Sequence, residues 1–473
     1  MDELFTARLA EFPLHQIPRE VAADLHPPLY FSLIRLWASV AGTSEFSLRW
    51  LSVFFSMLGI SLLWKLGYRL GGSSVALLSA AALSISPLFV EFSRMARYYS
   101  AVLTLGLLST FLLLKALESG RFPVWLSYGA VTAAMLYTFY PVVALVLAHG
   151  LALFLQSRPH SRWQWLITVS LAGLCFLPWA VVAIGQIPRA AEMTHADLAT
   201  TLPGLLLSAA YPFYAFSVGE TLFPWFPAAL PAVSAILILA VLGYLRCDRS
   251  TEVLLSLLLL VPVLFTAFTI TYISTGTPFL NAPVRSLFVL PYFLLLVVRG
   301  WHSLNRSLWR VGLGMLIGLA WILALRNMYT GQQYLNPNYI IPAREVAQQI
   351  AAQASPKDAV IGEWDSGFSY YYQRIPHLSV YLEAQPVEEA LRFLTSSSPE
   401  RVWLIIIGRD RTREATPVEL IQWLKTNYRL VEEKGYVPQD SAYRAFKERM
   451  LRRPAYLYKL VVYRFERPPE GGP

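Results

Sequence analysis

The chain has 473 residues, of which 55% are hydrophobic and only 15% are charged. Soluble globular domains carry about 25% charged residues, so this composition excludes a wholly soluble protein. Charges are scarce between residues 47 and 329 and return after 330, which predicts a membrane part followed by a soluble part. The net charge is +9, but many basic residues flank apolar runs as in cytoplasmic loops, so we expect no nucleic-acid partner.

Residues 1–46 form a polar N-terminal segment. It contains Asp2-Glu3 and later the run Asp24-Leu-His-Pro-Pro-Leu-Tyr. From Pro28 onward, apolar residues recur at helical spacing, and proline is tolerated in the first turn of a helix. The pattern predicts an amphipathic helix that lies on the outer membrane surface.

Three carboxylates of this segment, Asp2, Glu3 and Asp24, are candidates for general-base chemistry. Activation of an acceptor hydroxyl or amine needs a carboxylate within hydrogen-bond reach. The alternatives are a solvated terminus for the first two and a helix cap for Asp24. His26 follows Asp24 closely; it could act as a hydrogen-bonding partner or, with Asp24 and Glu3, hold a divalent metal. No cofactor is required by the pattern.

About twenty apolar residues cross a bilayer as a helix. We therefore expect about ten spans within residues 47–329. The stretch 203–218 is also apolar, but prolines interrupt it, so we interpret it as an interfacial or re-entrant helix. The expected spans are 47–69, 74–92, 98–118, 122–139, 141–157, 163–185, 224–246, 250–273, 284–301 and 307–328.

Lys and Arg gather on alternate loops between these spans, and such loops are cytoplasmic. The N-terminal segment and the part after 330 then lie outside a multi-pass protein of the cell (inner) membrane. Three arginines oppose this rule: Arg94 and Arg97 in an outer hairpin, and Arg285 at the outer start of a span. A salt bridge to Glu91 or contact with lipid headgroups would explain them. A lipid-phosphate site would also explain them, because a guanidinium fork matches phosphate oxygens.

Residues 330–473 predict a small extracytoplasmic α/β domain. Apolar strands at 358–363, 378–382 and 402–407 alternate with helical stretches at 386–394 and 417–428, and 457–465 adds a last strand. This alternation favours a small, mostly parallel sheet. No glycine-rich phosphate loop follows the first strand, so nucleotide binding is not supported.

Several motifs resemble, in order, those of the GT-C superfamily of membrane glycosyltransferases, especially the protein O-mannosyltransferase-like family and the lipid A aminoarabinose transferases. The resemblance covers the first hundred residues well; in the middle of the chain only the number of expected helices matches. The matching motifs are Asp2-Glu3, Asp24-Leu-His-Pro-Pro-Leu-Tyr, Gly42-Thr-Ser-Glu-Phe-Ser-Leu-Arg, Ser86-Pro87, Ala96-Arg-Tyr-Tyr and Pro283-Val-Arg.

The resemblance implies a mainly α fold: a polytopic membrane helix bundle with a small C-terminal α/β soluble domain. It also implies transfer of a sugar from a polyprenyl-phosphate donor to a lipid, glycan or protein acceptor on the outer face, among membrane lipids and with inversion. Asp2 would be the base, assisted by Glu3, while Arg97 and Arg285 would hold the donor phosphate. The candidate substrate-binding set is completed by His26, Arg94 and Tyr98.

Two alternatives stay open. A transporter or flippase of lipid-linked sugars would also be polytopic, although transporters place charge near the bilayer midplane and this chain gathers its candidates toward the outer surface. A truncated, non-catalytic member that binds lipid-linked sugar is the second alternative, because members of the family have a transmembrane helix before the Asp-Glu pair and this chain begins at that pair.

Overall fold

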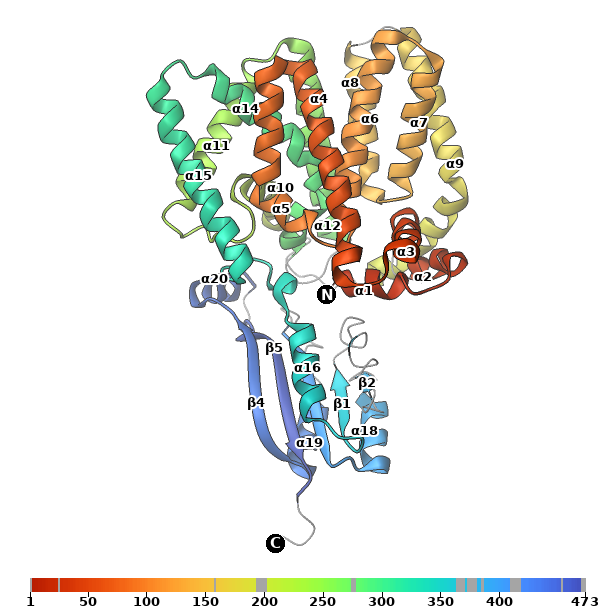
Figure 1. Ribbon diagram of the computed structural model, residues 1–473, viewed down its shortest axis with the longest axis vertical. Helices are drawn as coiled ribbons and strands as arrows, with labels where there is room; N and C mark the ends of the chain where they lie inside the picture. Colours follow the sequence, from red (N-terminus) through yellow and green to blue (C-terminus); the bar gives the residue numbers. More distant parts are fainter. Residues whose placement is uncertain are drawn as a thin grey trace. The chain divides into compact units, whose positions relative to one another are not determined.

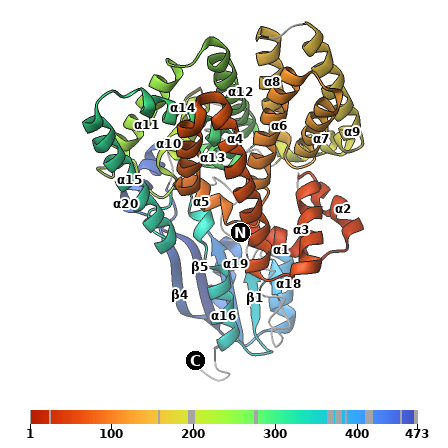
Figure 2. The same cartoon turned by 45° about the horizontal axis from the view of Figure 1, so that its top comes forward.

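The computed structural model describes residues 2–23, 26–156, 159–192, 202–273, 278–362, 371, 381–383, 387–408, 418–451 and 454–468. The chain divides into two compact units. The membrane unit is Leu9–Leu335, and the second unit joins Met1–Arg8 to Asn336–Pro473. Figures 1 and 2 show the first as a bundle of helices and the second as a sheet flanked by helices.

Helices dominate the membrane unit. Within the described residues, five are long and apolar enough to cross a membrane, or six if one bent pair counts as a span, and five shorter apolar helices accompany them. This confirms the polytopic bundle expected from the sequence. The main helices are α4 (Glu45–Ile85), α5 (Pro87–Ser93), α6 (Tyr99–Ser119), α7 (Phe122–Leu136), α8 (Val143–Gln156), α9 (Pro159–Glu192), α10 (Leu202–Val218), α11 (Ala229–Tyr244), α12 (Arg249–Ile273), α13 (Ala282–Arg285), α14 (Leu290–Ser303) and α15 (Ser307–Thr330).

Helix α4 contains the first two expected spans. Its backbone breaks at Gly72, where φ is 82°, a left-handed conformation that glycine adopts without steric cost. The chain then turns back, so that Gly67 lies against Ala76 and the two halves run side by side (Figure 1). The second expected span was too long, because α4 ends at Ile85 and α5 begins separately at Pro87.

A network of buried side chains connects five helices of the bundle. The Thr110 hydroxyl lies 2.6 Å from the Tyr292 hydroxyl and 3.0 Å from Nε2 of His149. Nδ1 of His149 lies 3.2 Å from the Tyr128 hydroxyl, which also accepts a bond from the Trp165 indole at 3.0 Å. Polar groups inside a bundle need such partners because neither lipid nor water supplies them.

The N-terminal part of the membrane unit consists of η1 (Leu14–Gln16), α2 (Ile17–Ala23) and α3 (Leu29–Ala41). Helix α3 confirms the helix expected from Pro28. Its ends are fastened to the bundle, because the Leu29 amide donates to the Tyr137 carbonyl at 2.9 Å and the Trp37 indole donates to the Ser47 carbonyl at 2.8 Å.

The C-terminal unit contains a five-stranded sheet in the order β2-β1-β3-β5-β4. β1 is parallel to β2 and β3, whereas β5 is antiparallel to β3 and β4. The sheet is therefore mixed rather than mostly parallel as expected. The strands are β1 (Ala359–Gly362), β2 (Tyr381–Glu383), β3 (Arg401–Ile407), β4 (Arg429–Pro438) and β5 (Tyr458–Glu466).

Helices cover both faces of this sheet. Helix α16 (Ala343–Gln353) buries Val346 and Ile350 against one face, where the N-terminal Leu4 also packs. Leu4 belongs to α1 (Asp2–Leu9), so the two ends of the chain share one core. On the other face, α18 (Val387–Ser397) and α19 (Val418–Asn427) pack against buried residues of β1, β3 and β5, among them Leu404 and Phe465.

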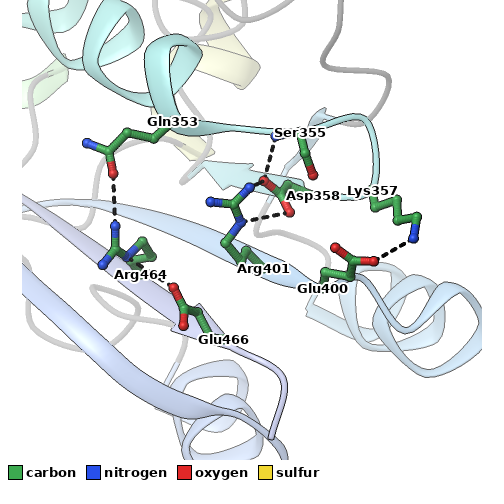
Figure 3. A network of polar contacts seen from close by, with 8 residues as sticks. All are labelled: Gln353, Ser355, Lys357, Asp358, Glu400, Arg401, Arg464 and Glu466. Atoms are coloured by element: carbon green, nitrogen blue, oxygen red, sulfur yellow. Dashed lines mark hydrogen bonds and ion pairs between the residues drawn. The ribbon is translucent and has the colours of Figure 1, made fainter. Parts of the chain in front are cut away.

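A polar network fixes the end of the sheet where β1 and β3 begin (Figure 3). Arg401 holds the fully buried Asp358 with two contacts, Nε to Oδ1 at 3.2 Å and Nη2 to Oδ2 at 3.0 Å. The Ser355 amide donates to the same carboxylate at 2.7 Å. Nearby, the hydrogen bond from Lys357 to Glu400 raises the pKa of Lys357 above its ordinary value.

Candidate functional site

Arg97 lies in the turn between α5 and α6, and its side chain is buried, with 5% of the residue exposed. Its Nη2 lies 3.2 Å from Nε2 of His26. A guanidinium can only donate, so Nε2 of His26 accepts this bond and the imidazole is neutral, with its proton on Nδ1. The structure thus brings together two candidate residues that are 71 positions apart in the chain.

Aromatic rings surround this pair. The Arg97 guanidinium carbon lies 5.2 Å from the centre of the Tyr98 ring and 5.8 Å from that of Phe31. The His26 ring lies 5.6 Å from both of these rings. Ring faces attract a guanidinium electrostatically, so the cluster stabilises the buried cation of Arg97.

Hydrogen bonds to the backbone fix the turn itself. The Ser52 hydroxyl, on α4, donates to the Arg97 carbonyl at 3.0 Å and lies 3.0 Å from the Tyr30 hydroxyl of α3. Arg97 is therefore positioned from three elements: its own turn, α3 and α4. The sequence analysis did not identify Ser52 or Phe31 as part of the site. It did identify the His-Pro-Pro-Leu-Tyr motif, which ends at Tyr30, next to Phe31.

A line of rings connects this cluster to the segment that carries Arg285. Tyr98 stacks on Phe139 with centroids 5.1 Å apart, and Phe139 meets the edge of Phe288 at 6.4 Å. Phe288 follows Arg285 by three residues, and Arg285 is half-buried at the end of α13. Among the described residues, Arg285 makes no hydrogen bond or ion pair with Arg97.

Arg94 makes different contacts. Its Nη2 lies 3.5 Å from the Tyr334 hydroxyl, and its guanidinium carbon lies 5.6 Å from the centre of the Tyr329 ring. Glu91 is buried and its charge interacts with that of Arg94, although no ion pair between the two is found within 4.0 Å in the described part of the chain. Arg94 belongs to a second cluster near the end of α15.

The candidate carboxylates lie elsewhere or outside the description. Glu3 is half-buried in α1, which belongs to the C-terminal unit; Asp2 begins the same helix. Asp24 falls outside the residues that the structure describes. The suggested metal set of Glu3, Asp24 and His26 stays a prediction, and no group of three or more metal-binding side chains occurs within the described ranges.

Part of the chain matches a known family model, and its fold is similar to that of solved structures. Residues 25–182 match the family model of dolichyl-phosphate-mannose-protein mannosyltransferases. No curated protein sequence matches the chain.

Solved structures with a similar fold include ArnT from Cupriavidus metallidurans, in the apo state (TM-score 0.53) and bound to undecaprenyl phosphate (TM-score 0.51). Each is 13% identical, over 97% of this chain and 93% of that chain. The apo oligosaccharyltransferase of Archaeoglobus fulgidus is 11% identical, over 98% of this chain and 84% of that chain, with a TM-score of 0.50.

Proposed function

We propose that this chain, a membrane protein with the fold of the GT-C glycosyltransferases, transfers a sugar from a polyprenyl-phosphate carrier to an acceptor on the outer face of the inner membrane. One observation carries the proposal: the buried guanidinium of Arg97, held by His26 and two aromatic rings. A positive charge is expensive at membrane depth and is kept there for function.

Arg97 is the residue that we assign to the donor phosphate. Its planar fork suits two phosphate oxygens. His26 fixes the guanidinium, and the Ser52 hydroxyl fixes the Arg97 backbone, before the donor arrives. Tyr98 forms one wall of the cluster. Arg285 is the second phosphate ligand in this proposal, and the rings of Phe139 and Phe288 place its segment beside Tyr98.

The donor class is supported by the matched family model, which describes dolichyl-phosphate-mannose enzymes, and by the similarity to ArnT, which has been solved with undecaprenyl phosphate. Both carriers are polyprenyl phosphates, and they require from a protein a cation for the headgroup and apolar surface for the tail. Arg94 would approach the same donor from the second cluster.

In the reaction, an acceptor oxygen or nitrogen attacks the anomeric carbon. A carboxylate takes the acceptor proton, the bond from the anomeric carbon to the phosphate oxygen breaks, and its electron pair stays on the phosphate. Asp2 is the proposed base, with Glu3 assisting and Asp24 as the substitute. The arginines act because charge develops on the departing phosphate, and preorganised cations stabilise such charge.

Turnover tests this proposal directly. The purified protein is incubated with a mixed pool of polyprenyl-phosphate sugars and a membrane extract as acceptor, and mass spectrometry follows the release of polyprenyl phosphate. Release that is lost in Asp2→Asn supports both the reaction and its base. Release that persists in Asp2→Asn and is lost in Asp24→Asn moves the base to Asp24. No release from folded wild-type protein, with binding of the donor retained, would refute the enzyme and leave a lipid-binding or transport protein.

A further inference from the structure

A buried glutamine joins the end of α9 to the N-terminal part of the membrane unit. Gln186 lies near the end of α9 and is only 4% exposed, although the helix before it is strongly apolar. Its Nε2 donates to the Ala22 carbonyl of α2 at 2.8 Å, and Figure 1 shows this end of α9 next to α2. A buried side-chain amide needs partners for its polar atoms, so the contacts of Gln186 show what it holds.

Two further hydrogen bonds orient this amide. A tryptophan indole can only donate, so the Tyr140 hydroxyl accepts from Nε1 of Trp179 at 2.8 Å. The hydroxyl can then donate its own proton to Oε1 of Gln186, which lies 3.0 Å away. Because Oε1 accepts from this side, Nε2 of Gln186 faces the Ala22 carbonyl.

The bond to Ala22 fixes backbone that also holds His26. The Val21 carbonyl, directly before Ala22 in the chain, accepts from the His26 amide at 3.2 Å. Nε2 of His26 in turn accepts from Arg97 at 3.2 Å. A shift of the backbone at Val21 and Ala22 would therefore move the imidazole that contacts the guanidinium.

The Tyr140 hydroxyl belongs to a turn on the other side of the same cluster. Tyr140 begins η2 (Tyr140–Val142) and directly follows Phe139, whose ring stacks on Tyr98 with centroids 5.1 Å apart. Tyr98 is one of the two rings that surround the guanidinium. The amide at the end of α9 is thus bonded to two sides of the cluster: the backbone before the imidazole and the turn behind the aromatic wall.

We propose that Gln186 is a positioning residue, which holds both sides of the Arg97 cluster in the arrangement that binds the donor phosphate. The inference rests on the proposed function, because it assigns this arrangement to donor binding. Gln186 acts through its neighbours and does not itself contact the donor. Hydrogen bonds around a binding site improve affinity because a preorganised site loses less freedom when the ligand binds.

Calorimetry of the full-length protein in detergent, with a short-chain polyprenyl phosphate, tests this inference. Gln186→Met keeps a side chain of similar length but loses both hydrogen bonds, and it should weaken binding about 3- to 10-fold, as expected for one neutral hydrogen bond. Tyr140→Phe removes only the hydroxyl that orients the amide, so it should weaken binding less. Hydrogen exchange at the His26 amide should be faster in Gln186→Met, because the Val21 carbonyl is held less firmly.

The matched control is Gln156→Met. Gln156 also uses both polar atoms of its amide, since Nε2 donates to the Ser250 carbonyl at 3.0 Å and Oε1 accepts from the Ser250 hydroxyl at 2.9 Å. It lies at the end of α8 that is farther from η2. Gln156→Met should therefore keep the wild-type affinity and leave hydrogen exchange at His26 unchanged.

Three results would overturn the inference, and they can be told apart. Wild-type affinity in Gln186→Met, together with lost binding in Arg97→Ala, would remove the positioning role and leave the donor site intact. Equal weakening by Gln186→Met and Gln156→Met would show a general loosening of the bundle. No binding of polyprenyl phosphate by the wild-type protein would refute the proposed function, and the inference with it.

Discussion

Replacement of Arg97 by lysine separates the geometry of its guanidinium from its charge. Lysine keeps the charge and the attraction of the two rings, but it loses the planar fork and the 3.2 Å bond to His26. One hydrogen bond to a charged group contributes about 1.5–3 kcal/mol. At about 1.4 kcal/mol per factor of ten, Arg97→Lys should weaken the binding of a polyprenyl phosphate roughly 10- to 150-fold.

Calorimetry in detergent with a short-chain polyprenyl phosphate measures this change. Arg97→Ala, which removes the charge as well, should weaken binding more strongly than the lysine variant. The matched control is Arg69→Lys, because Arg69 is also an arginine of the membrane unit but pairs with Glu118 on α6. An affinity of Arg97→Lys within twofold of wild type, in protein that elutes as a single folded species, would refute the phosphate assignment.

Three further substitutions test the structure. Asp358→Asn should destabilise the C-terminal unit by about 2–4 kcal/mol, because it leaves the Arg401 cation without its carboxylate, and hydrogen exchange of β1 and β3 would report the loss. Gly243→Ala should prevent assembly of α11 on α14, since a methyl group there would overlap the Leu296 carbonyl; size-exclusion chromatography would show aggregation. Tyr128→Phe should lower stability by about 1–2 kcal/mol, seen as a lower Tm in detergent, because it removes the central hydroxyl of the buried network.

Each of these three substitutions has a control substitution that should change stability or assembly little. Lys357→Met removes a pair that is exposed on both sides, and such surface pairs contribute little. Gly312→Ala adds its methyl group in open space. Tyr137→Phe removes a hydroxyl at an exposed bond to the Cys175 carbonyl. A control that fails as badly as its test variant would show that the proposed contact is not the cause.

The membrane bundle was predictable from the sequence because apolar length and charge-free runs are local properties. Helix α3 follows from the helical spacing of its apolar residues, and the spans after it follow from apolar length. The break at Ser86 was missed, because a Ser-Pro step inside an apolar run does not say whether the helix kinks or ends. Strand β4 was missed for a different reason: it is an edge strand without a fully buried residue and with four charged residues among its ten, and such a strand has little apolar signal.

The candidate site was predictable only in part. The unusual positions of Arg94 and Arg97 in an outer hairpin identified them from charge alone, but charge does not say what a side chain contacts. The structure separates the two: Arg97 meets His26, while Arg94 meets Tyr334. Ser52 could not have been found, because a serine inside a span carries no signal until the backbone that it bonds is known.

The packing of Leu4 on the C-terminal sheet restricts how the chain crosses the membrane. Because α1 and residues 336–473 form one compact unit, the chain must leave that unit and return to it on the same face of the bilayer. The number of crossings between Leu9 and Leu335 is therefore even, whichever face this is. Ten crossings satisfy the condition, and α10 could become a full crossing only if another helix ceased to be one. If the ten expected spans are kept, an even number of crossings agrees with the prediction that residues 203–218 form an interfacial or re-entrant helix.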